Sequence, residues 1–284
     1  MEVKAYFLRR IQVGHTSCGA IRKLSQNIVK GRILGRKPKL YTDENMVCIR
    51  WGCTGEVPQK NVLNTAKAIS LVNDKKESRI LFAKHKLAPE TWGSVAEWQK
   101  DKTLPVIVRP AVHAQGRNLW MCNSEAEVIA ATNKCPRGFY ISRFINKEAE
   151  YRVFVAQGRA VWVAKKTPGN PDDIAWNVAR GGRFDNVRWE DWPLGVVRTA
   201  IEALNLTELD FGGVDVMVQG KDYHVLEINS APSQTSPYRQ ECCAKVFDWM
   251  IVNGKKPLPL VPDKGGYLKF IHPALDNKAK MVNA

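Results

Sequence analysis

The sequence has no long apolar run, and its N-terminus shows no apolar segment ahead of a cleavage site. A membrane-spanning helix needs about 18 or more consecutive apolar residues, so no such helix is predicted. The hydrophobic content of 44% is ordinary for a folded domain and argues against disorder. A chain of 284 residues can bury a sizeable core, as one large or two smaller domains. We therefore expect a soluble, cytoplasmic protein.

Cysteine pairs with the spacing Cys-x-x-Cys are also absent, and the seven cysteines are odd in number. This pattern argues against a zinc site and against a disulfide framework. No feature of the sequence supports a catalytic cysteine–histidine pair. Cys48 and Cys122 are predicted to pack inside strands as small hydrophobic residues.

Acidic residues are scarce, with 28 Asp and Glu against 43 Lys and Arg, which gives a formal net charge of +15. Ten basic residues but only one acid, Glu2, occur in the first 40 positions. Such an excess favours binding of an acidic macromolecule, either nucleic acid or an acidic polypeptide, and general solubility is the alternative explanation. No zinc-finger, helix-turn-helix or RNA-recognition signature is present. The predicted contacting residues are Arg9, Arg10, Arg22, Lys23, Lys30, Arg32, Arg36, Lys37 and Lys39.

The most informative segment that is present runs over residues 210–232, where two strand-like apolar runs are joined by a short turn. Alternation along the second strand puts Glu227 and Asn229 on one face and Leu226 on the other. A three-residue turn would place Asp215 opposite Glu227. Two carboxylates and an amide oxygen would then converge, and such donors suit Mg²⁺ together with substrate phosphates. An ordinary hairpin with an inward ion pair is the alternative.

Gly213-Val214-Asp215 followed by Leu226-Glu227-Ile228-Asn229 resembles the metal-binding end of the ATP-grasp superfamily. Further motifs follow in the family's order over roughly residues 46–253, and the RimK-like and D-alanine–D-alanine ligase-like branches are the most similar. The resemblance implies an α/β chain with the α+β ATP-grasp fold, in which an N-terminal α/β lobe precedes two lobes that clamp ATP. The implied parts are 1–72 (N-terminal lobe), 73–145 (central ATP-binding lobe), 146–253 (C-terminal lobe with the metal site) and 254–284 (basic tail).

The resemblance also assigns residues to the phosphates of ATP. A helical run that begins at Asp74-Lys75 matches the family's entry segment and makes Lys75 a phosphate-contacting cation, with a solvated surface lysine as the alternative. The buried strand 105–110 ends in Arg109, at a position where relatives usually have Lys. Arg binds phosphate in a bidentate manner, so the role is retained although the geometry differs. The loop that follows contains His113 and Gly116 and resembles the loop that closes over the phosphates.

Residues 139–145 resemble the hinge strand that recognises adenine. Ser142 stands where relatives often have an acid, so recognition is expected to use backbone groups and an apolar wall from Arg143, Phe144 and Ile145. In the next strand, Glu150 matches the acid that binds the ribose hydroxyls.

Catalytic residues are implied in the same way. One of Lys165 and Lys166 is expected to face the phosphates or the substrate, and Lys165 is the candidate that we name. The segment 177–182 resembles part of the RimK-like glutamate ligases and places Asn177 and Arg180 near the transferred phosphoryl group, with a plain loop as the alternative. Arg180, Lys165 or Arg152 would stabilise the developing oxyanion.

The N-terminal lobe is predicted to contain strands over 3–8 and 46–52, a helix capped by Ser17 that runs to Ile28, and a helix over 61–71. Arg50 would lie at the carboxyl end of a strand, where ligands gather in open α/β sheets, and is a candidate to bind a substrate carboxylate.

The resemblance implies an ATP-dependent, ADP-forming ligase that joins a carboxylate to an amine through an acyl phosphate. Its expected cofactors are ATP and two Mg²⁺ ions, or Mn²⁺, held by Asp215, Glu227 and Asn229. Two alternatives stay open, a kinase that phosphorylates a hydroxyl and a non-catalytic nucleic-acid-binding protein on the same scaffold. The sequence does not identify the substrates, and a homo-oligomer is left open.

Overall fold

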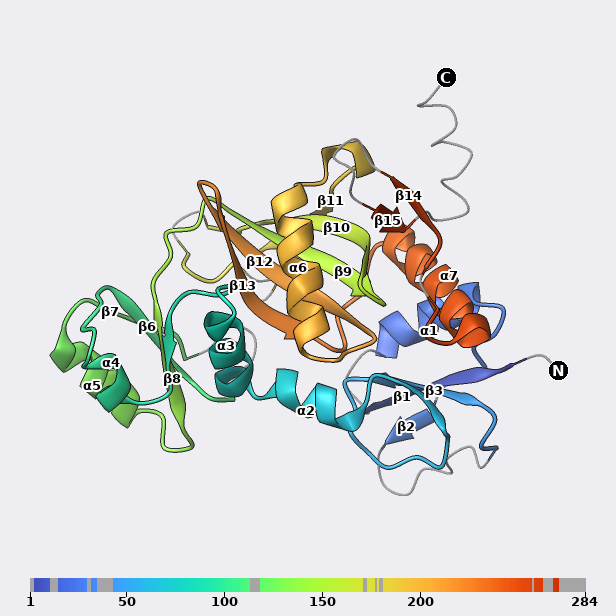
Figure 1. Ribbon diagram of the computed structural model, residues 1–284, viewed down its shortest axis with the longest axis horizontal. Coiled ribbons are helices and arrows are strands. Elements are labelled where there is room, and N and C mark those ends of the chain that lie inside the picture. The colour runs from blue at the N-terminus through green and yellow to red at the C-terminus, as the bar shows by residue number, and fades with distance from the viewer. Residues whose placement is uncertain are drawn as a thin grey trace.

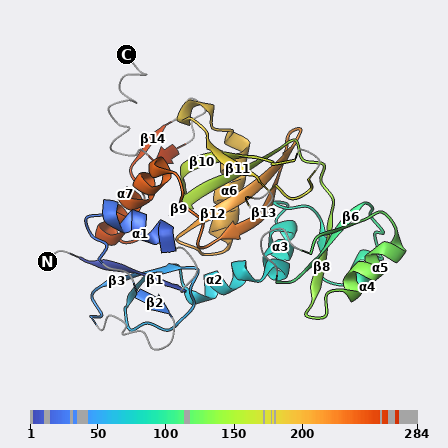
Figure 2. The ribbon, with the colours of Figure 1, turned by 180° about the vertical axis from the view of Figure 1, so that it is seen from behind.

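The computed structural model describes residues 3–10, 15–29, 32–34, 43–112, 118–170, 173–176, 178, 181–256, 258–262 and 268–270. These residues form a chain of three sheet-containing parts and a short C-terminal hairpin (Figures 1 and 2). Among them, no helix is long and apolar enough to cross a membrane.

The N-terminal part is a four-stranded parallel sheet in the order β2-β1-β3-β4. The predicted helix over 61–71 is wrong at its start, because residues 61–63 pair with β3 and Thr65 caps a helix that begins only at Ala66. The predicted cap at Ser17 is also wrong, because Ser17 lies inside a helix that ends before Ile28. The elements are β1 (Ala5–Arg10), α1 (His15–Leu24), β2 (Arg32–Leu34), β3 (Val47–Trp51) and β4 (Asn61–Leu63).

The central part is a smaller antiparallel sheet in the order β5-β8-β6-β7, which lies at one end of the molecule (Figure 1). Asp74 lies between α2 and α3. Its carboxylate accepts hydrogen bonds from the backbone N–H groups of Lys76 and Glu77 and so caps α3. The elements are α2 (Ala66–Asn73), α3 (Lys75–Lys84), β5 (Thr91–Trp92), α4 (Val95–Trp98), β6 (Val106–Pro110), β7 (Trp120–Cys122), α5 (Glu125–Asn133) and β8 (Phe139–Arg143).

The C-terminal part is a five-stranded antiparallel sheet in the order β11-β10-β9-β12-β13. Val153 and Val155 of β9 pack in the core that includes α6, whereas Phe154 and Ala156 pack in the core that includes α7. Burial on both faces explains why the second half of this strand, residues 153–156, is continuously apolar. The elements are β9 (Ala149–Ala156), β10 (Arg159–Thr167), β11 (Arg183–Asn186), η2 (Trp189–Asp191), α6 (Leu194–Leu206), β12 (Phe211–Gln219), β13 (Asp222–Asn229), α7 (Pro237–Asn253), β14 (Leu260–Pro262) and β15 (Leu268–Phe270).

Aromatic side chains connect the first and last parts into one core. Phe7 and Trp51 of the N-terminal sheet contact each other at 5.6 Å between ring centroids, and each also contacts Phe247 of α7. Trp51 stacks on Phe211 of β12 at 5.8 Å. Large buried rings contribute strongly to packing, so the N-terminal lobe is held firmly against the C-terminal lobe. The lobe boundaries stay predictions.

Candidate functional site

The hairpin of β12 and β13 places the two predicted metal-binding carboxylates side by side. Asp215 is paired directly with Glu227, as the sequence predicts. The turn differs from the prediction, because Gln219 already pairs with Asp222 and only two residues remain in the turn. A register shift just after Asp215 supplies the extra residue. The three-residue turn is therefore wrong, whereas the pairing it was meant to explain is confirmed.

Asp215 is held by a guanidinium from the neighbouring strand. Arg152 of β9 lies opposite it in the register and donates through Nε to Oδ1 at 2.5 Å and through Nη2 to Oδ2 at 2.7 Å. This bidentate geometry is the strong form of the Arg–carboxylate pair. Burial lowers the pKa of Arg152, but the charges of Asp215, Glu227 and Glu150 together outweigh it, and the net shift is upward. A Cβ at Gly213 would come within 2.8 Å of Pro232, so glycine lets the loop after β13 approach this strand.

Two lysines enclose the second buried acid, Glu150 of β9, which is 2% exposed. Lys166 of β10 lies opposite it and contacts Oε1, and Lys147 donates to Oε2 at 2.5 Å. The Lys166 ammonium also reaches Oδ2 of Asp215 at 3.3 Å. Burial lowers the pKa of Lys166, but Asp215 and Glu150 together raise it above its ordinary value. Glu150 thus has both oxygens bound by lysines, and the predicted ribose contact stays untested.

The pairing of Lys166 corrects the choice between the two lysines. Lys165 is exposed on β10 and does not line the cavity, whereas Lys166 is buried and does. Successive residues of a strand point to opposite faces, so only one of the two can face Arg152 and Glu150. Lys166 replaces Lys165 as the candidate catalytic lysine.

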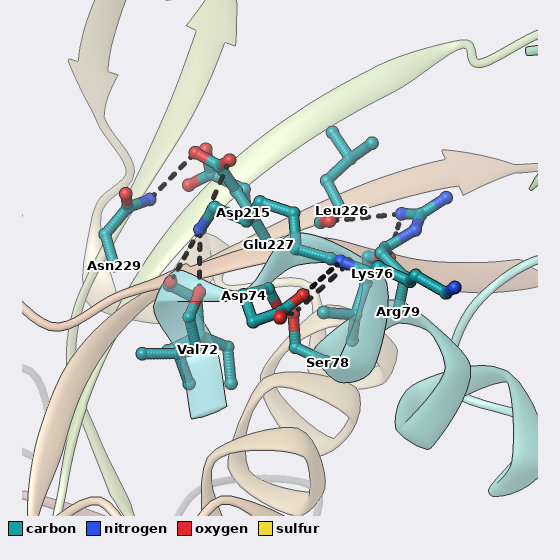
Figure 3. A network of polar contacts seen from close by, with 12 residues as sticks. Val72, Asp74, Lys76, Ser78, Arg79, Asp215, Leu226, Glu227 and Asn229 are labelled. Atoms are coloured by element: carbon teal, nitrogen blue, oxygen red, sulfur yellow. Dashed lines mark hydrogen bonds and ion pairs between the residues drawn. The ribbon is translucent and has the colours of Figure 1, made fainter. Parts of the chain in front are cut away.

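Glu227 is surrounded by donors from two directions. Asn229 donates through Nδ2 to Oε1 at 3.0 Å, and the Lys75 ammonium lies 3.7 Å from Oε2 (Figure 3). Burial raises the pKa of Glu227, but the charges of Lys75, Arg152 and Lys166 and the bond from Asn229 lower it further, well below its usual range. Glu227 is therefore ionised and available as an acceptor.

Lys75 itself does not line the cavity. Its ammonium donates to the carbonyl oxygens of Val72 at 3.0 Å and Ile228 at 3.3 Å, in addition to its contact with Glu227. In this structure Lys75 supports the carboxylate of Glu227, and the alternative of a solvated surface lysine is wrong because the Lys75 side chain is only 12% exposed.

Arg79 is a site residue that the sequence did not single out. It is 6% exposed and donates through Nη1 to the carbonyl oxygen of Leu226 at 3.1 Å (Figure 3). Nη1 also donates to the carbonyl oxygen of Val225 at 2.8 Å, and Nη2 donates to Ser142 Oγ at 2.9 Å. Its hydrogen-bond acceptors are two carbonyl groups and a hydroxyl, all of them neutral. Burial removes water from the guanidinium and lowers the pKa of Arg79. Arg79 lies one helical turn after Lys75, on the same face of α3. This spacing from a predicted phosphate-contacting residue is the sequence feature that could have identified Arg79.

These groups surround a cavity of about 620 Å³ between the central and C-terminal sheets. Arg79 and Arg109 line it from the central part, and Arg109 has a buried Nε without an acceptor among the described residues. Leu226 lines the same cavity as Glu227, so the predicted separation of these two onto opposite faces is wrong. The register shift next to Asp215 accounts for this, because strict alternation fails there.

The hinge strand borders the cavity through Arg143, Phe144 and Ile145, as expected. Two of its backbone donors are already used, because the N–H of Arg143 bonds to Glu90 and the N–H of Phe144 bonds to Pro105. Adenine recognition by these two N–H groups is therefore excluded in this structure. Ser142 is turned to Arg79 and Thr91.

Several predicted residues cannot be placed. Asn177, Arg180, Gly116 and His113 lie outside the described residues. Arg50 is described and buried, and its Nη1 donates to the carbonyl oxygens of Cys53 and Gly55, so the protein backbone already occupies this candidate for a substrate carboxylate.

The donor set fits Mg²⁺ in type and number. No group of three or more His, Cys, Asp or Glu side chains that could hold a metal exists among the described residues. The hairpin instead offers two carboxylates, Asp215 and Glu227, and the amide of Asn229. Mg²⁺ typically binds one or two carboxylates and completes its shell with water and substrate phosphates. Because Arg152 engages both oxygens of Asp215, Glu227 and Asn229 are the more available donors.

Comparisons with known proteins agree with this geometry. The model of the RimK-like ATP-grasp domain matches residues 66–245. A probable alpha-L-glutamate ligase of Aeromonas salmonicida (strain A449) is 24% identical over 189 residues, which make up 62% of this chain and 62% of that protein. A protein of the same description from Haemophilus influenzae (strain ATCC 51907 / DSM 11121 / KW20 / Rd) is 26% identical over 263 residues, 81% of this chain and 85% of that protein. The chain thus spans less than two thirds of the length of the first of these relatives.

Solved structures show the same fold. D-alanine–D-alanine ligase from Bacillus anthracis superposes with a TM-score of 0.65 at 12% identity, over 89% of this chain and 97% of that chain. The ATP-grasp ligase PsnB, complexed with a phosphomimetic variant of its minimal precursor, Mg and ADP, has a TM-score of 0.58 at 9% identity, over 87% of this chain and 99% of that chain. The predicted ATP-grasp fold is confirmed.

Proposed function

Because the chain belongs to the RimK-like ATP-grasp family, we propose that it is an ATP-dependent ligase that joins a carboxylate to an amine and releases ADP and phosphate. The observation that supports this most is the pairing of Asp215 with Glu227 at a cavity that Arg79, Arg109, Arg152 and Lys166 also line. A cavity with this charge pattern can hold a triphosphate next to ionised metal-binding groups.

In the proposed reaction, an oxygen of the substrate carboxylate attacks the γ-phosphorus of ATP, and the bond to the β-phosphate oxygen breaks, so that ADP leaves. The resulting acyl phosphate is then attacked at its carbonyl carbon by the amine nitrogen, the amide bond forms, the amine loses a proton, and inorganic phosphate leaves. Positioning and charge neutralisation supply most of the catalysis in phosphoryl transfer.

The side chains divide this work by position. Arg79 and Arg109 bind the phosphates from the central part, where both line the cavity. Arg152 and Lys166, which face the same space from β9 and β10, stabilise the negative charge on the phosphoryl and carbonyl oxygens. Lys75 keeps Glu227 ionised.

Asp215, Glu227 and Asn229 would hold Mg²⁺, which neutralises phosphate charge when it is bound. We propose two such ions, with Mn²⁺ as a substitute.

An acidic polypeptide or nucleic acid remains part of the proposal as a partner of the basic N-terminal lobe. Arg10 and Lys23 are exposed, which supports it. The prediction that Arg9 contacts such a partner is wrong. Its position on β1 turns the side chain into the protein, where the residue is only 8% exposed. Arg22 is half-buried, and the side chains of the other five lie outside the described residues.

A product analysis tests the ligase. The purified protein is incubated with ATP, Mg²⁺ and panels of carboxylates and amines, and ADP release and products are measured. A ligase releases ADP and phosphate only when both substrates are present, whereas a kinase leaves the phosphoryl group on a hydroxyl. ADP release that needs no amine, or a phosphorylated hydroxyl product, would contradict the proposal.

A further inference from the structure

A second groove lies between the N-terminal sheet and the C-terminal end of α7. It has a volume of about 1320 Å³, and all three residues of β4 line it together with residues 250–256. It shares no lining residue with the cavity between the central and C-terminal sheets. The N-terminal sheet lies at the end of the molecule away from the central part (Figures 1 and 2). We call this second site the N-lobe groove.

The N-lobe groove includes the amino ends of two parallel strands. Lys4 precedes β1, Met46 precedes β3 and Val47 begins β3, and all three line the groove. Ligands of open α/β sheets usually bind at the carboxyl ends of the strands. The N-lobe groove is therefore a surface separate from the one at which such a sheet normally contributes to a reaction.

Basic residues dominate the described lining of the groove. Its only acid is Asp43, and its basic members are Lys4, Arg50, Lys60, Lys255 and Lys256. Two of the lysines pair with acids beside the groove, Lys60 with Glu44 at 3.0 Å and Lys255 with Asp210 at 3.6 Å. These two lysine side chains are 81% and 79% exposed, and exposed pairs contribute little. The basic excess remains when both acids are counted.

Arg50 is the buried member of this basic set. It is 6% exposed, and its acceptors among the described residues are the carbonyl oxygens of Cys53 and Gly55, which are neutral. Its Nε is buried and has no acceptor among the described residues. A buried charge without a partner of opposite sign is costly, so a guanidinium in the wall of the groove favours an anionic occupant.

The groove also has an apolar wall that is open to solvent. Val3 and Val252 are 36% and 62% exposed, and Met46 and Val62 are half-buried. Exposed apolar surface with a polar rim is typical of interaction sites. Single-stranded nucleic acid is usually bound by stacking of its bases on aromatic side chains, and none occurs among the described residues that line the groove. The wall therefore favours a peptide over nucleic acid.

The shape of the site suits an extended chain. Within the described part of the protein, β4 pairs with β3 on one side and with no strand on the other. An extended peptide can add to such an edge, and its side chains then alternate between two faces. The groove is also about twice as large as the cavity of about 620 Å³, so it exceeds what a single small anion needs.

We propose that the N-lobe groove binds an extended peptide segment in which acidic residues alternate with apolar ones. The acidic side chains contact Lys60, Lys256 and Arg50, and the apolar ones lie against Val62 and Val252. This inference specifies the acidic polypeptide of the proposed function, and it rests on that part of the proposal but not on the ligase chemistry. The segment is held outside the nucleotide cavity, so it docks the polypeptide without taking part in the reaction.

Peptide binding is measured directly, without turnover. A fluorescent dodecapeptide in which Glu alternates with Val and Leu is titrated with the protein, and anisotropy is recorded. We expect this peptide to bind, and the same peptide with Gln in place of Glu to bind at least about tenfold more weakly. Its affinity should fall with added salt, because the attraction is screened over about 8 Å at physiological ionic strength. A saturating non-hydrolysable ATP analogue with Mg²⁺ should leave the affinity unchanged.

Charge reversal locates the acidic contacts. Lys60→Glu combined with Lys256→Glu should weaken binding of the Glu peptide by about tenfold or more, because attraction becomes repulsion. The matched control is Lys84→Glu combined with Lys100→Glu, which makes the same change in net charge at exposed lysines of the central part. Affinity for the ATP analogue and the melting temperature should stay at the wild-type values in both double variants.

A substitution in the apolar wall tests the other half of the proposal. Val252→Asp should weaken binding of the Glu peptide, because it places a like charge and a polar group where an apolar side chain docks. Ile129→Asp is the matched control, since Ile129 is 43% exposed on α5 and lies outside the groove.

Four results would overturn the proposal. The first is no binding of the Glu peptide to the wild type at low salt, and the second is unchanged affinity in the Lys60 and Lys256 double variant or an equal loss in its control. Displacement of the peptide by the ATP analogue would place it in the nucleotide cavity instead. Tighter binding of a labelled RNA oligonucleotide that is lost in the same double variant would assign the groove to nucleic acid. Failure of the ligase is distinguishable, because it would appear as absence of ADP release while the peptide still binds.

Discussion

Asp215 and Glu227 lie directly opposite each other on β12 and β13, and a register shift next to Asp215 makes this pairing compatible with a two-residue turn. The shift also brings Leu226 to the cavity beside Glu227. A local irregularity in one hairpin therefore positions both a carboxylate that we propose to bind the metal and an apolar wall of the proposed nucleotide site.

We expect Glu227→Gln to abolish ADP release while the fold survives. The substitution keeps the shape of the side chain but removes the negative charge that Lys75 and Asn229 support. The loss should exceed tenfold in rate, on the roughly 3–5 kcal/mol scale of an uncompensated buried charge. ADP release and far-UV circular dichroism check it, with the exposed Glu190→Gln as control. Wild-type turnover in Glu227→Gln would show that the metal assignment is wrong.

Arg109→Lys should be tolerated, and Arg109→Ala should not. A cation at the end of β6 is what the phosphates require. The Nε of Arg109 has no acceptor among the described residues, which indicates that a ligand completes its hydrogen bonding. The loss of a charge-assisted bond should weaken nucleotide binding by about 10- to 100-fold. Titration with an ATP analogue measures this, and an unchanged dissociation constant in Arg109→Ala would remove the residue from the phosphate site.

Lys166→Met and Lys165→Met form a matched pair on neighbouring positions of one strand. Lys166 is buried against Glu150 and Asp215, so its loss should lower the free energy of unfolding by about 1–3 kcal/mol and ADP release by more than tenfold. Lys165 is exposed and its loss should change neither. Chemical denaturation and ADP release check both variants, and equal effects would contradict the assignment of Lys166 to the site.

The lowered pKa of Glu227 predicts a pH dependence of stability. A carboxyl group whose pKa is lower in the folded state stabilises it above the unfolded pKa, about 4.3, and loses this contribution as the pH falls through the folded value. The stability difference between the wild type and Glu227→Gln should therefore shrink below about pH 4.3. Denaturation curves without nucleotide, measured from pH 7 to pH 3, test this. A difference that stays constant over the range would mean that Glu227 is not stabilised as a carboxylate.

The exposed charges of the N-terminal lobe are tested by reversal. Arg10→Glu combined with Lys23→Glu should weaken binding of poly-L-glutamate or single-stranded RNA without changing ATP affinity. The attraction is screened over about 8 Å at physiological ionic strength, so the wild-type affinity should also fall steeply with added salt. Fluorescence anisotropy with both probes measures the effect and distinguishes the two partners. Equal binding by the reversed variant at low salt would leave solubility as the explanation of the charge.

The sequence by itself determined the fold family, the order of the motifs, and the placement of Asp215, Glu227 and Asn229 on one hairpin. These features depend on local spacing and on alternation along single strands, which a linear pattern records directly. The helix that begins at Lys75, with Asp74 as its cap, and the buried strand that ends near Arg109 could be located for the same reason.

Only the tertiary structure decided which cations share the site. Two adjacent lysines on β10 cannot be told apart until the register with β9 is known, because that pairing sets which one meets Glu150. Arg79 and Arg239 come from helices that precede and follow the sheet, and they meet opposite edges of it. Such contacts join residues far apart in sequence, so neither periodicity nor spacing encodes them. Packing of the lobes around the cavity is what brings these charges together.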